Sequence, residues 1–175
     1  EIKNVKNSFI QSENQQVMAI GQKDLIIIST KDALLIMPNN KNINIKESIQ
    51  NLSKKNNEKT QYHPTVYRPW GSFEVLLTKK NYQVKKLIIN PKQKISYQKH
   101  KYRSEHWIVV KGKACVTKNN KTYNLKKNQS IDIPKGAKHR VENKKKIPLT
   151  IIEIQTGDKL LENDIIRFED IYNRN

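Results

Sequence analysis

Two short segments of the sequence gather the side chains that are best suited to metal binding or acid–base chemistry. In the first, Gln98 and His100 are two residues apart at the end of an expected strand, and Glu105 opens the next strand. In the second, His139 begins a strand directly after the turn residues 134–136. Side chains two apart in a strand leave the same face, so Gln98 and His100 should lie side by side. Imidazole and carboxylate groups bind metal ions and transfer protons, which makes these segments the candidate site.

Residues 64–175 consist of short runs with strand-like composition, divided by turns. The spacing is typical of a β-sandwich or barrel, and the expected strands are Gly71–Leu77, Tyr82–Ile89, Ile95–Gln98, Glu105–Lys111, Lys113–Lys118, Lys121–Leu125, Ser130–Ile133, His139–Glu142 and Leu149–Thr156. Asn119 and Asn120 can take the left-handed conformation that a tight hairpin needs. After Gly157 the apolar spacing changes and predicts a closing helical segment, through Leu160, Ile165, Phe168 and Ile171.

Residues 1–53 form a smaller β-rich segment. Its expected strands are Ser8–Gln11, Gln16–Ile20, Leu25–Ser29 and Ala33–Ile36. Apolar residues then recur at helical spacing and predict a helix over 44–54. Residues 54–63 are polar without periodicity and predict a linker. So few elements make a poor domain alone, so we interpret this part as the tail of something longer or as an arm packed on the second part. The first residue, Glu1, also suggests a fragment.

The two candidate segments resemble the paired motifs of the cupin barrel, the double-stranded β-helix or jelly roll. The first motif matches at Lys92, Gln98, His100, Glu105 and Gly112, and the second at Asn128, Pro134, Gly136, His139 and Asn143. Lys92 and Asn128 replace turn glycines, and Asn tolerates a positive φ better than Lys does. Gln98 replaces the first histidine of the family pattern. The resemblance implies an all-β cupin barrel preceded by a small β-rich segment with a short helix.

Longer blocks of the chain resemble the type II mannose-6-phosphate isomerase family. The blocks are Tyr67–Gly71, Gln98–Trp107, Ile133–Asn143, Ile152–Gly157 and an ending that runs from Glu162 to Arg174. In that family the domain is often fused behind a mannose-1-phosphate guanylyltransferase. The stretch from Asn7 to Leu35 is similar to the last part of such a transferase, which implies the division into residues 1–53, a linker 54–63 and a cupin domain 64–175. Lys101 and Tyr102 stand where relatives often carry His.

The family resemblance implies a metal-dependent enzyme. Such an enzyme interconverts mannose 6-phosphate and fructose 6-phosphate and feeds mannose 1-phosphate, GDP-mannose and polysaccharide biosynthesis. The implied metal ligands are Gln98, His100, Glu105 and His139. Their mixed nitrogen and oxygen donors suit a divalent ion, zinc first, with manganese, iron, cobalt or nickel as alternatives.

The phosphate of such a substrate needs cations that stay charged, and arginine matches its geometry best. Arg103 and Arg140 each adjoin expected ligands, so both are expected at the mouth of the site as substrate-binding and catalytic residues. Lys99 and Lys135 are further candidates for phosphate binding. All four lie in the part of the chain that carries most of the positive charge.

The proton-shuttling base is expected among the carboxylates near the C-terminus. Glu153 lies in the last long strand and is the first candidate, with Glu162 and Asp164 as alternatives. The site residues also have structural interpretations, because Gln98 could hydrogen-bond within the barrel and each arginine could pair with a glutamate. His106 points away from Glu105 and indicates a structural role. Two tryptophans and the cysteine are expected in the core, namely Trp70, Trp107 and Cys115.

Composition narrows the classes of function. The 175 residues carry a formal net charge of +18, but only five of the 34 basic residues are arginine. Lysine is scattered along the chain together with many Ile and Asn, whose codons are also A/T-rich, so a nucleic-acid partner is disfavoured. One cysteine cannot form an internal disulfide, and no long apolar run is present, so we expect a cytoplasmic protein without a membrane span.

The sequence is also compatible with a second function. The chain could be the C-terminal part of a guanylyltransferase whose cupin domain only binds or regulates, since cupins host many chemistries. It lacks a Gly-rich nucleotide-binding start and should not make GDP-mannose alone. The resemblance to cupins also implies a homodimer.

Overall fold

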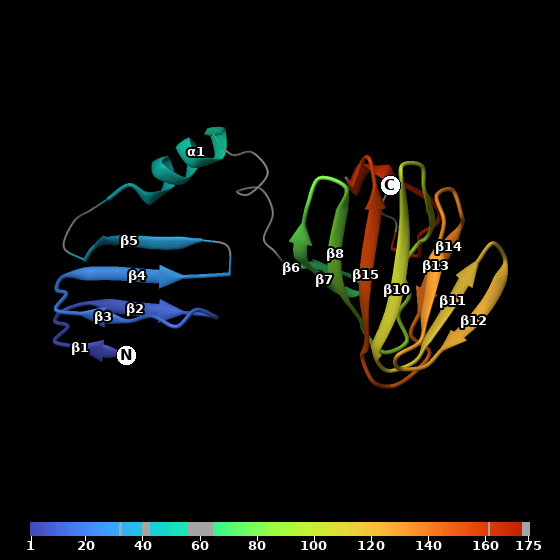
Figure 1. Cartoon of the computed structure of the whole chain (residues 1–175), viewed down its shortest axis with the longest axis horizontal. Coiled ribbons are helices and arrows are strands. Elements are labelled where there is room, and N and C mark those ends of the chain that lie inside the picture. The colour runs from blue at the N-terminus through green and yellow to red at the C-terminus, as the bar shows by residue number, and fades with distance from the viewer. Residues whose placement is uncertain (32, 40–42, 56–64, 161, 173–175) are drawn as a thin grey trace. The chain divides into compact units, whose positions relative to one another are not determined.

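The computed structural model describes residues 1–31, 33–39, 43–55, 65–160 and 162–172. Its contacts divide the chain into two units, residues 1–64 and 65–175, each with its own sheets (Figure 1). Of the linker expected at 54–63, residues 56–63 lie outside the described residues, and residues 54 and 55 end a helix. None of the described helices is long and apolar enough to cross a membrane.

The first unit contains short strands and one helix among its described residues. They are β1 (Ile2–Lys3), β2 (Phe9–Ser12), β3 (Ala19–Ile20), β4 (Leu25–Ser29), β5 (Leu34–Pro38) and α1 (Ile45–Lys55). β1 pairs with β3 and β2 with β4, both in parallel, so the chain winds in successive coils up to β4, and β4 then pairs with β5 as an antiparallel hairpin. The expected helix is confirmed, and Asn44 caps it by accepting a hydrogen bond from the Glu47 N–H at 3.3 Å. The strand expected at 16–20 shortens to two residues.

The second unit is built from two antiparallel sheets. The six-stranded sheet has the order β13 (Ser130–Ile133), β10 (Arg103–Lys111), β15 (Leu149–Gly157), β8 (Tyr82–Ile89), β7 (Gly71–Thr78) and β6 (Thr65–Arg68). The five-stranded sheet has the order β12 (Lys121–Leu125), β11 (Ala114–Lys118), β14 (His139–Glu142), β9 (Tyr97–His100) and β16 (Ile165–Glu169). Figure 1 shows β8, β15 and β10 side by side.

The inner faces of these two sheets enclose an apolar core. Along β10 and β15, buried residues alternate with more exposed ones, as expected for strands with one face against a core. The most deeply buried apolar side chains come from both sheets and include Trp107, Val109, Leu149, Ile151, Val116 and Val141. Trp70, Trp107 and Cys115 are buried, as the sequence predicts.

Toward one end of each inner row, apolar side chains give way to polar ones. On β10 the buried positions change from Val109 and Trp107 to Glu105 and Arg103. On neighbouring strands the change gives Glu153 and Gln155 on β15 and Lys85 on β8. The register places Trp107 opposite Glu153, and Glu153 opposite Lys85. Because these positions are inward-facing, the polar groups are buried together rather than solvated.

Two turns of the cupin motifs have a non-glycine residue in the left-handed region of backbone conformation. Lys92 has φ 63° and Asn128 has φ 67°, at the positions where the motif has glycine. The poorly suited Lys92 therefore still adopts the turn, and its Nζ donates to the Lys144 carbonyl at 2.8 Å. Asn143, the last residue of the second motif, donates from Nδ2 to the carbonyls of Ile89 and Ile147 at 3.0 and 2.8 Å. Asn143 thus ties the end of β8 to the loop that follows β14, which explains its place in the motif.

The helix predicted after Gly157 is wrong. The segment forms a short 3-10 turn at Glu162–Asp164 and then strand β16. β16 pairs with β9, with Ile165 opposite His100 and Arg167 opposite Gln98. β-branched and aromatic residues favour strands, and the unpaired edge of β9 supplies hydrogen-bond partners that an isolated helix would not have.

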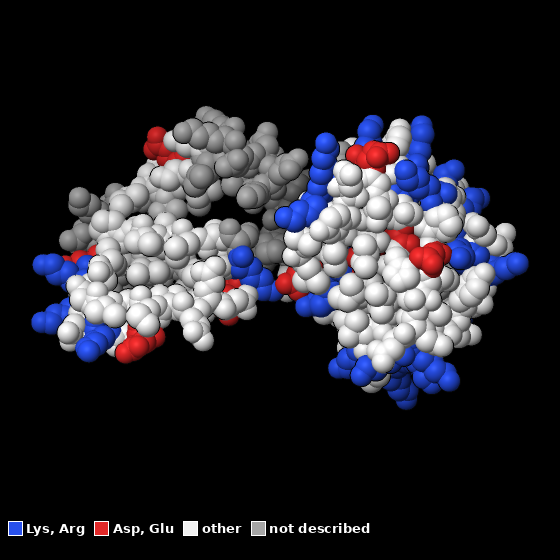
Figure 2. Space-filling model, viewed as in Figure 1, with Lys and Arg blue, Asp and Glu red and all other residues white. Residues whose placement is uncertain are grey.

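Lysine and arginine side chains surround the barrel unit. On the face seen in Figure 2 they lie mostly around its edges, and acidic and uncharged side chains lie nearer the middle. The positive charge is thus distributed, as the scattered lysines of the sequence predict.

Gly71 offers a test of the turn geometry. Its φ of 144° is a conformation that only glycine adopts easily, and an added Cβ would lie 2.0 Å from the Ile88 carbonyl oxygen. Gly136 also has a positive φ, 77°, but an added Cβ would meet no atom within 4 Å. We expect Gly71→Ala to lower the free energy of unfolding by about 3 kcal/mol or more, and Gly136→Ala by about 1–2 kcal/mol. Urea unfolding measures both, and equal losses would contradict the geometry.

Candidate metal centre

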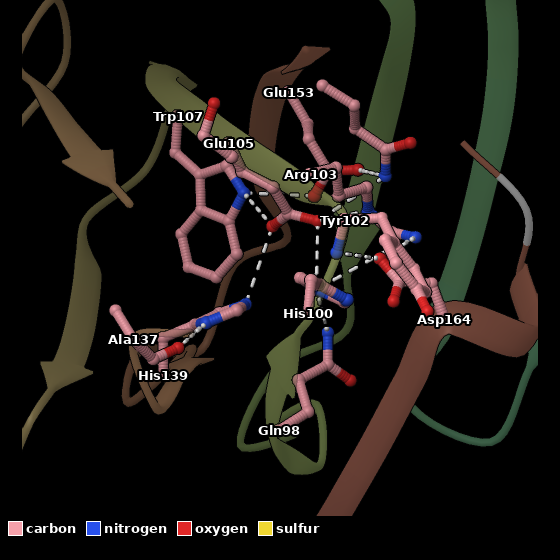
Figure 3. Close-up of polar contacts among 12 residues, drawn as sticks. Gln98, His100, Tyr102, Arg103, Glu105, Trp107, Ala137, His139, Glu153 and Asp164 are labelled. Carbon is pink, nitrogen blue, oxygen red and sulfur yellow. Dashed lines mark hydrogen bonds and ion pairs between the residues drawn. The ribbon is translucent and has the colours of Figure 1, made fainter. Parts of the chain in front are cut away.

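The buried carboxylate of Glu105 is the hub of the site (Figure 3). Its Oε1 lies 3.0 Å from His100 Nε2 and accepts a hydrogen bond from Arg103 Nε at 3.1 Å. Its Oε2 accepts a hydrogen bond from Trp107 Nε1 at 3.1 Å and lies 3.4 Å from His139 Nε2. Glu105 is only 3% exposed, so these neighbours rather than water must compensate its charge.

His139 presents one nitrogen to this carboxylate. Its Nδ1 lies 2.9 Å from the Ala137 carbonyl oxygen, which can only accept, so Nδ1 carries the proton in the neutral ring. The lone pair of Nε2 then faces Glu105 Oε2, and Nε2 is buried without a hydrogen-bond partner among the described residues. Two facing lone pairs repel unless a proton or a metal ion lies between them. The tight turn before β14 sets this orientation, since Gly136 donates its N–H to the His100 carbonyl at 2.8 Å.

His100 and Gln98 extend the same cluster from β9. Their Nε2 atoms are 3.5 Å apart, and both side chains are buried. Ser96 donates its hydroxyl to Gln98 Oε1 at 2.8 Å. The amide oxygen and nitrogen are assigned from such contacts, and a half-turn of the amide would present Oε1 to the cluster instead.

Glu105 and His139 shift each other's pKa in opposite directions. Burial alone would raise the pKa of Glu105, but hydrogen bonds and charge attraction from His100 and His139 outweigh burial and hold that pKa well below its usual range. Burial alone would lower the pKa of His139, but its hydrogen bond and attraction to Glu105 raise that pKa above the ordinary value. A carboxylate that stays ionised next to two imidazoles is a site for a cation.

These residues fit a divalent metal ion. The ligand atoms of His100, Glu105 and His139 lie within 4.8 Å of one another, and all three residues are buried. Neutral imidazole nitrogens and a carboxylate oxygen are the donors that zinc and related ions prefer. Gln98 could supply a fourth donor after the amide turn. The structure thus brings together the four residues expected to bind metal.

Arg103 and Asp164 support the cluster from one side. The Arg103 side chain is 2% exposed, with Nη2 3.5 Å from His100 Nε2 and Nη1 4.0 Å from Asp164 Oδ2. Asp164 accepts hydrogen bonds from the backbone N–H groups of Lys101 and Tyr102 at 3.0 and 3.1 Å. Asp164 therefore holds the turn between β9 and β10. The side chain of Glu162, the other alternative base, lies outside the described residues.

A cavity opens beside the cluster, between the inner faces of the two sheets. It is open to solvent on one side, and Gln98, Arg103 and Glu105 form part of its wall. Glu153 also lines it, with Oε2 accepting from Trp107 Nε1 at 2.9 Å and Oε1 accepting from Gln155 Nε2 at 2.7 Å. Two buried carboxylates thus share one indole N–H, next to space that a small substrate could occupy.

Three expected phosphate-binding residues lie away from this cavity. Lys99 Nζ lies 5.6 Å from the ring centre of Phe168 on the outer face of β9. Arg140 donates from Nη1 to Glu169 Oε2 at 2.8 Å, and Lys135 Nζ lies 3.8 Å from Asp158 Oδ2 at an exposed position. Lys99 and Arg140 differ from the expectation because adjacent strand residues face opposite sides, so a neighbour of an inward histidine points outward. Lys135 lies in the exposed turn between β13 and β14.

Five polar residues of the cavity wall were not predicted. They are Arg68, Lys85, Ser96, Gln155 and Arg167. Strand alternation could have indicated two of them, since Lys85 shares a face with Leu87 and Ile89, and Gln155 shares a face with Ile151. Arg68 ends β6 and Arg167 lies in the middle of β16; both fall in blocks that carry the family resemblance, but strand alternation alone does not point to them.

Removing one imidazole should remove metal binding. We expect the chain to bind one zinc ion, and His139→Ala to weaken that binding by about 100-fold or more, because a direct ligand is lost. Calorimetric titration and metal content measure this change. His106→Ala is the matched control, since His106 lies on the opposite face with Nδ1 2.5 Å from Asp132 Oδ1. Equal zinc affinity of the two variants would contradict the assignment.

Metal affinity should also rise with pH. The raised pKa of His139 means that a proton occupies the metal-facing nitrogen up to a higher pH than the ordinary value of about 6.5. Metal and proton compete for that lone pair, so affinity should fall by up to about tenfold per pH unit on acidification below the His139 pKa. Because the pKa of Glu105 is held well below its usual range, Glu105 stays ionised and adds nothing to the slope of metal affinity against pH. Zinc titrations between about pH 5.5 and 8 measure it, and a flat profile would show that His139 is not a ligand.

Comparison with solved structures shows the fold of the barrel unit. A protein with a double-stranded β-helix domain from Klebsiella pneumoniae aligns with a TM-score of 0.51 at 17% identity, over 63% of this chain and 89% of that one. KdgF from Halomonas sp. aligns with a TM-score of 0.51 at 11% identity, over 55% of this chain and 90% of that one. The barrel is therefore a cupin, as the sequence motifs predict.

Curated relatives match almost the whole chain. The mannose-1-phosphate guanylyltransferase ManC of Salmonella typhimurium is 40% identical over 169 residues, which is 97% of this chain and 35% of that protein. The alginate biosynthesis protein AlgA of Pseudomonas aeruginosa is 41% identical over 168 residues, 96% of this chain and 35% of that protein. The chain thus spans about a third of the length of these relatives.

Two family models divide the chain between them. Residues 4–52 match the MannoseP isomerase/GMP-like beta-helix domain. Residues 55–170 match the mannose-6-phosphate isomerase C-terminal domain, and this match includes every residue of the metal cluster. The chain therefore belongs to the mannose-6-phosphate isomerase C-terminal family.

Proposed function

We propose that the chain catalyses the metal-dependent interconversion of mannose 6-phosphate and fructose 6-phosphate. The observation that carries the proposal is the buried His100, Glu105 and His139 cluster, whose Glu105 also lines a cavity with Arg103 and Glu153. A candidate cation site, a second carboxylate and a positive charge would then adjoin one small volume, which supports the proposal. The family of the chain supports the same reaction.

The reaction moves a proton between C2 and C1 of the open-chain sugar. An enediolate with negative charge on its oxygens forms between the two proton transfers, so a catalyst must supply a base and stabilise that charge. A divalent ion, zinc by preference, held by His100, Glu105, His139 and Gln98 would polarise the sugar oxygens. The rest of the chemistry falls to the side chains of the cavity wall.

Glu153 is the proposed base. Its two hydrogen bonds, from Trp107 and Gln155, fix the orientation of a carboxylate that is only 6% exposed. A carboxylate held in this way can take a proton from one carbon and deliver it to the neighbouring carbon without moving. Arg103 has its Nε on Glu105 and its side chain in the cavity wall, so it adds positive charge close to the reacting oxygens.

Further properties follow from the proposed reaction. A sugar-phosphate isomerase acts on metabolites of the cytoplasm, and the buried Cys115, which forms no disulfide, is compatible with a reducing compartment. The proposed assembly is a homodimer that contains two barrels. Fusion to a guanylyltransferase, as the names of the relatives suggest, would place the product next to GDP-mannose synthesis.

The proposal predicts isomerisation of mannose 6-phosphate by the purified chain, lost on chelation and restored by a divalent ion. Glu153→Gln should lower kcat by about 100-fold or more while zinc affinity stays unchanged, because the base is lost but no ligand is. Glu142→Gln is the control, since Glu142 follows the buried Val141 and pairs with Lys144 at 3.7 Å. A coupled assay measures turnover, and deuterium uptake from solvent reports the proton transfer itself.

A folded, metal-loaded chain without turnover would contradict the proposal. The chain would then be a binding or regulatory cupin, the alternative that its coverage of only a third of the guanylyltransferase relatives favours. Turnover that Glu153→Gln leaves intact would keep the isomerase but remove Glu153 as its base.

A further inference from the structure

The wall of the cavity carries more positive side chains than the metal cluster requires. Arg68, Lys85, Arg103 and Arg167 line it from four different strands, together with the two carboxylates Glu105 and Glu153. Arg103 is committed to Glu105 at 3.1 Å. The other cations increase the positive potential of the cavity, which favours an anionic ligand.

Two of these cations lie against one aromatic ring. Lys85 Nζ is 4.8 Å from the centre of the Phe73 ring, and Arg68 Cζ is 5.7 Å from the same point. Phe73 lies on β7, the strand between β6 and β8 that carry the two cations. A ring face attracts cations by its quadrupole, so Phe73 is a common neighbour of both positive groups at the cavity wall.

The two cations differ in depth. Lys85 is 4% exposed on the inner face of β8, whereas Arg68 is exposed at the end of β6. Across the sheet Lys85 lies opposite Glu153, so its charge belongs to the buried polar group of the cavity wall. The pair therefore runs from the inside of the cavity to its rim, on the β6, β7 and β8 side.

We propose that Arg68 and Lys85 bind the phosphate group of the sugar phosphate. The identity of the sugar rests on the proposed isomerase function, but the phosphate chemistry does not. The guanidinium of Arg68 can donate two N–H groups to two phosphate oxygens, and the Lys85 ammonium adds a point charge with three donors. The phosphate then lies beside Phe73, and the sugar extends toward Gln98 and Glu105 of the same cavity wall.

Lys85 also lies opposite Glu153 in the strand register. A lysine that only positions Glu153 would affect the proton transfer and leave the affinity for phosphate unchanged. A lysine that binds phosphate would affect the affinity for inorganic phosphate and the KM for mannose 6-phosphate. These two roles therefore separate in a binding measurement without turnover.

The test titrates inorganic phosphate, and separately mannose 6-phosphate, into the full chain and its variants by calorimetry. We expect Lys85→Met and Arg68→Gln each to weaken both ligands by about 10–100-fold, the effect of losing a charged hydrogen bond. Lys86→Met is the matched control on the same strand, because Lys86 points outward and pairs with Glu74 at 2.7 Å. It should bind both ligands as the unaltered chain does.

Each outcome decides the proposal. Equal phosphate affinity of Arg68→Gln, Lys85→Met and Lys86→Met would overturn it, and so would a loss of kcat in Lys85→Met with unchanged affinity. If Lys85→Met does not fold, the exposed Arg68 still carries the test. Phosphate binding that depends on both residues in a chain without isomerase activity would support the phosphate site and contradict the proposed function, so the two failures are distinguishable.

Discussion

The ionised carboxylate of Glu105 is the constraint around which the site is built. A buried carboxylate is tolerated only when charges and donors surround it. His100 and Arg103 meet one oxygen at 3.0 and 3.1 Å, and Trp107 meets the other at 3.1 Å. The lone pair of His139 faces the same oxygen as Trp107, at 3.4 Å, and leaves one position that suits a cation. The candidate cation site and the raised pKa of His139 both follow from this one group.

The barrel positions these side chains by continuing its core pattern with polar residues. The inward rows of β8, β10 and β15 are apolar along most of the barrel and polar where they meet the cavity. Backbone contacts then fix the turns that carry the ligands. Asp164 binds the N–H groups of residues 101 and 102, and the Ala137 carbonyl orients His139. A rigid frame of this kind keeps donors at fixed positions before any ligand arrives.

The motif resemblance predicted the cupin barrel and named residues that the structure does bring together as a candidate metal cluster, because the turns and strand starts of this fold lie at fixed separations. Strand alternation correctly predicts that Gln98 lies with His100 and that His106 lies on the opposite face. The same rule predicts Lys99 and Arg140 on the outer face, which is not where we expected them. Arg68 and Arg167 could not be found this way, because their approach to the cavity depends on pairings between strands far apart in sequence. The closing helix failed because edge pairing with β9 outweighed helical spacing.

The central claim is that His100, Glu105 and His139 hold one divalent ion at the wall of the substrate cavity. A crystal of the full chain grown with zinc and a hexitol 6-phosphate, a non-reacting reduced sugar phosphate, tests it through the anomalous scattering of zinc. We predict one strong peak within about 2.0–2.3 Å of a nitrogen of each histidine and an oxygen of Glu105, with the sugar in the adjoining cavity. A zinc peak at another place, or an empty cluster in a crystal that binds the sugar phosphate in this cavity, would contradict it.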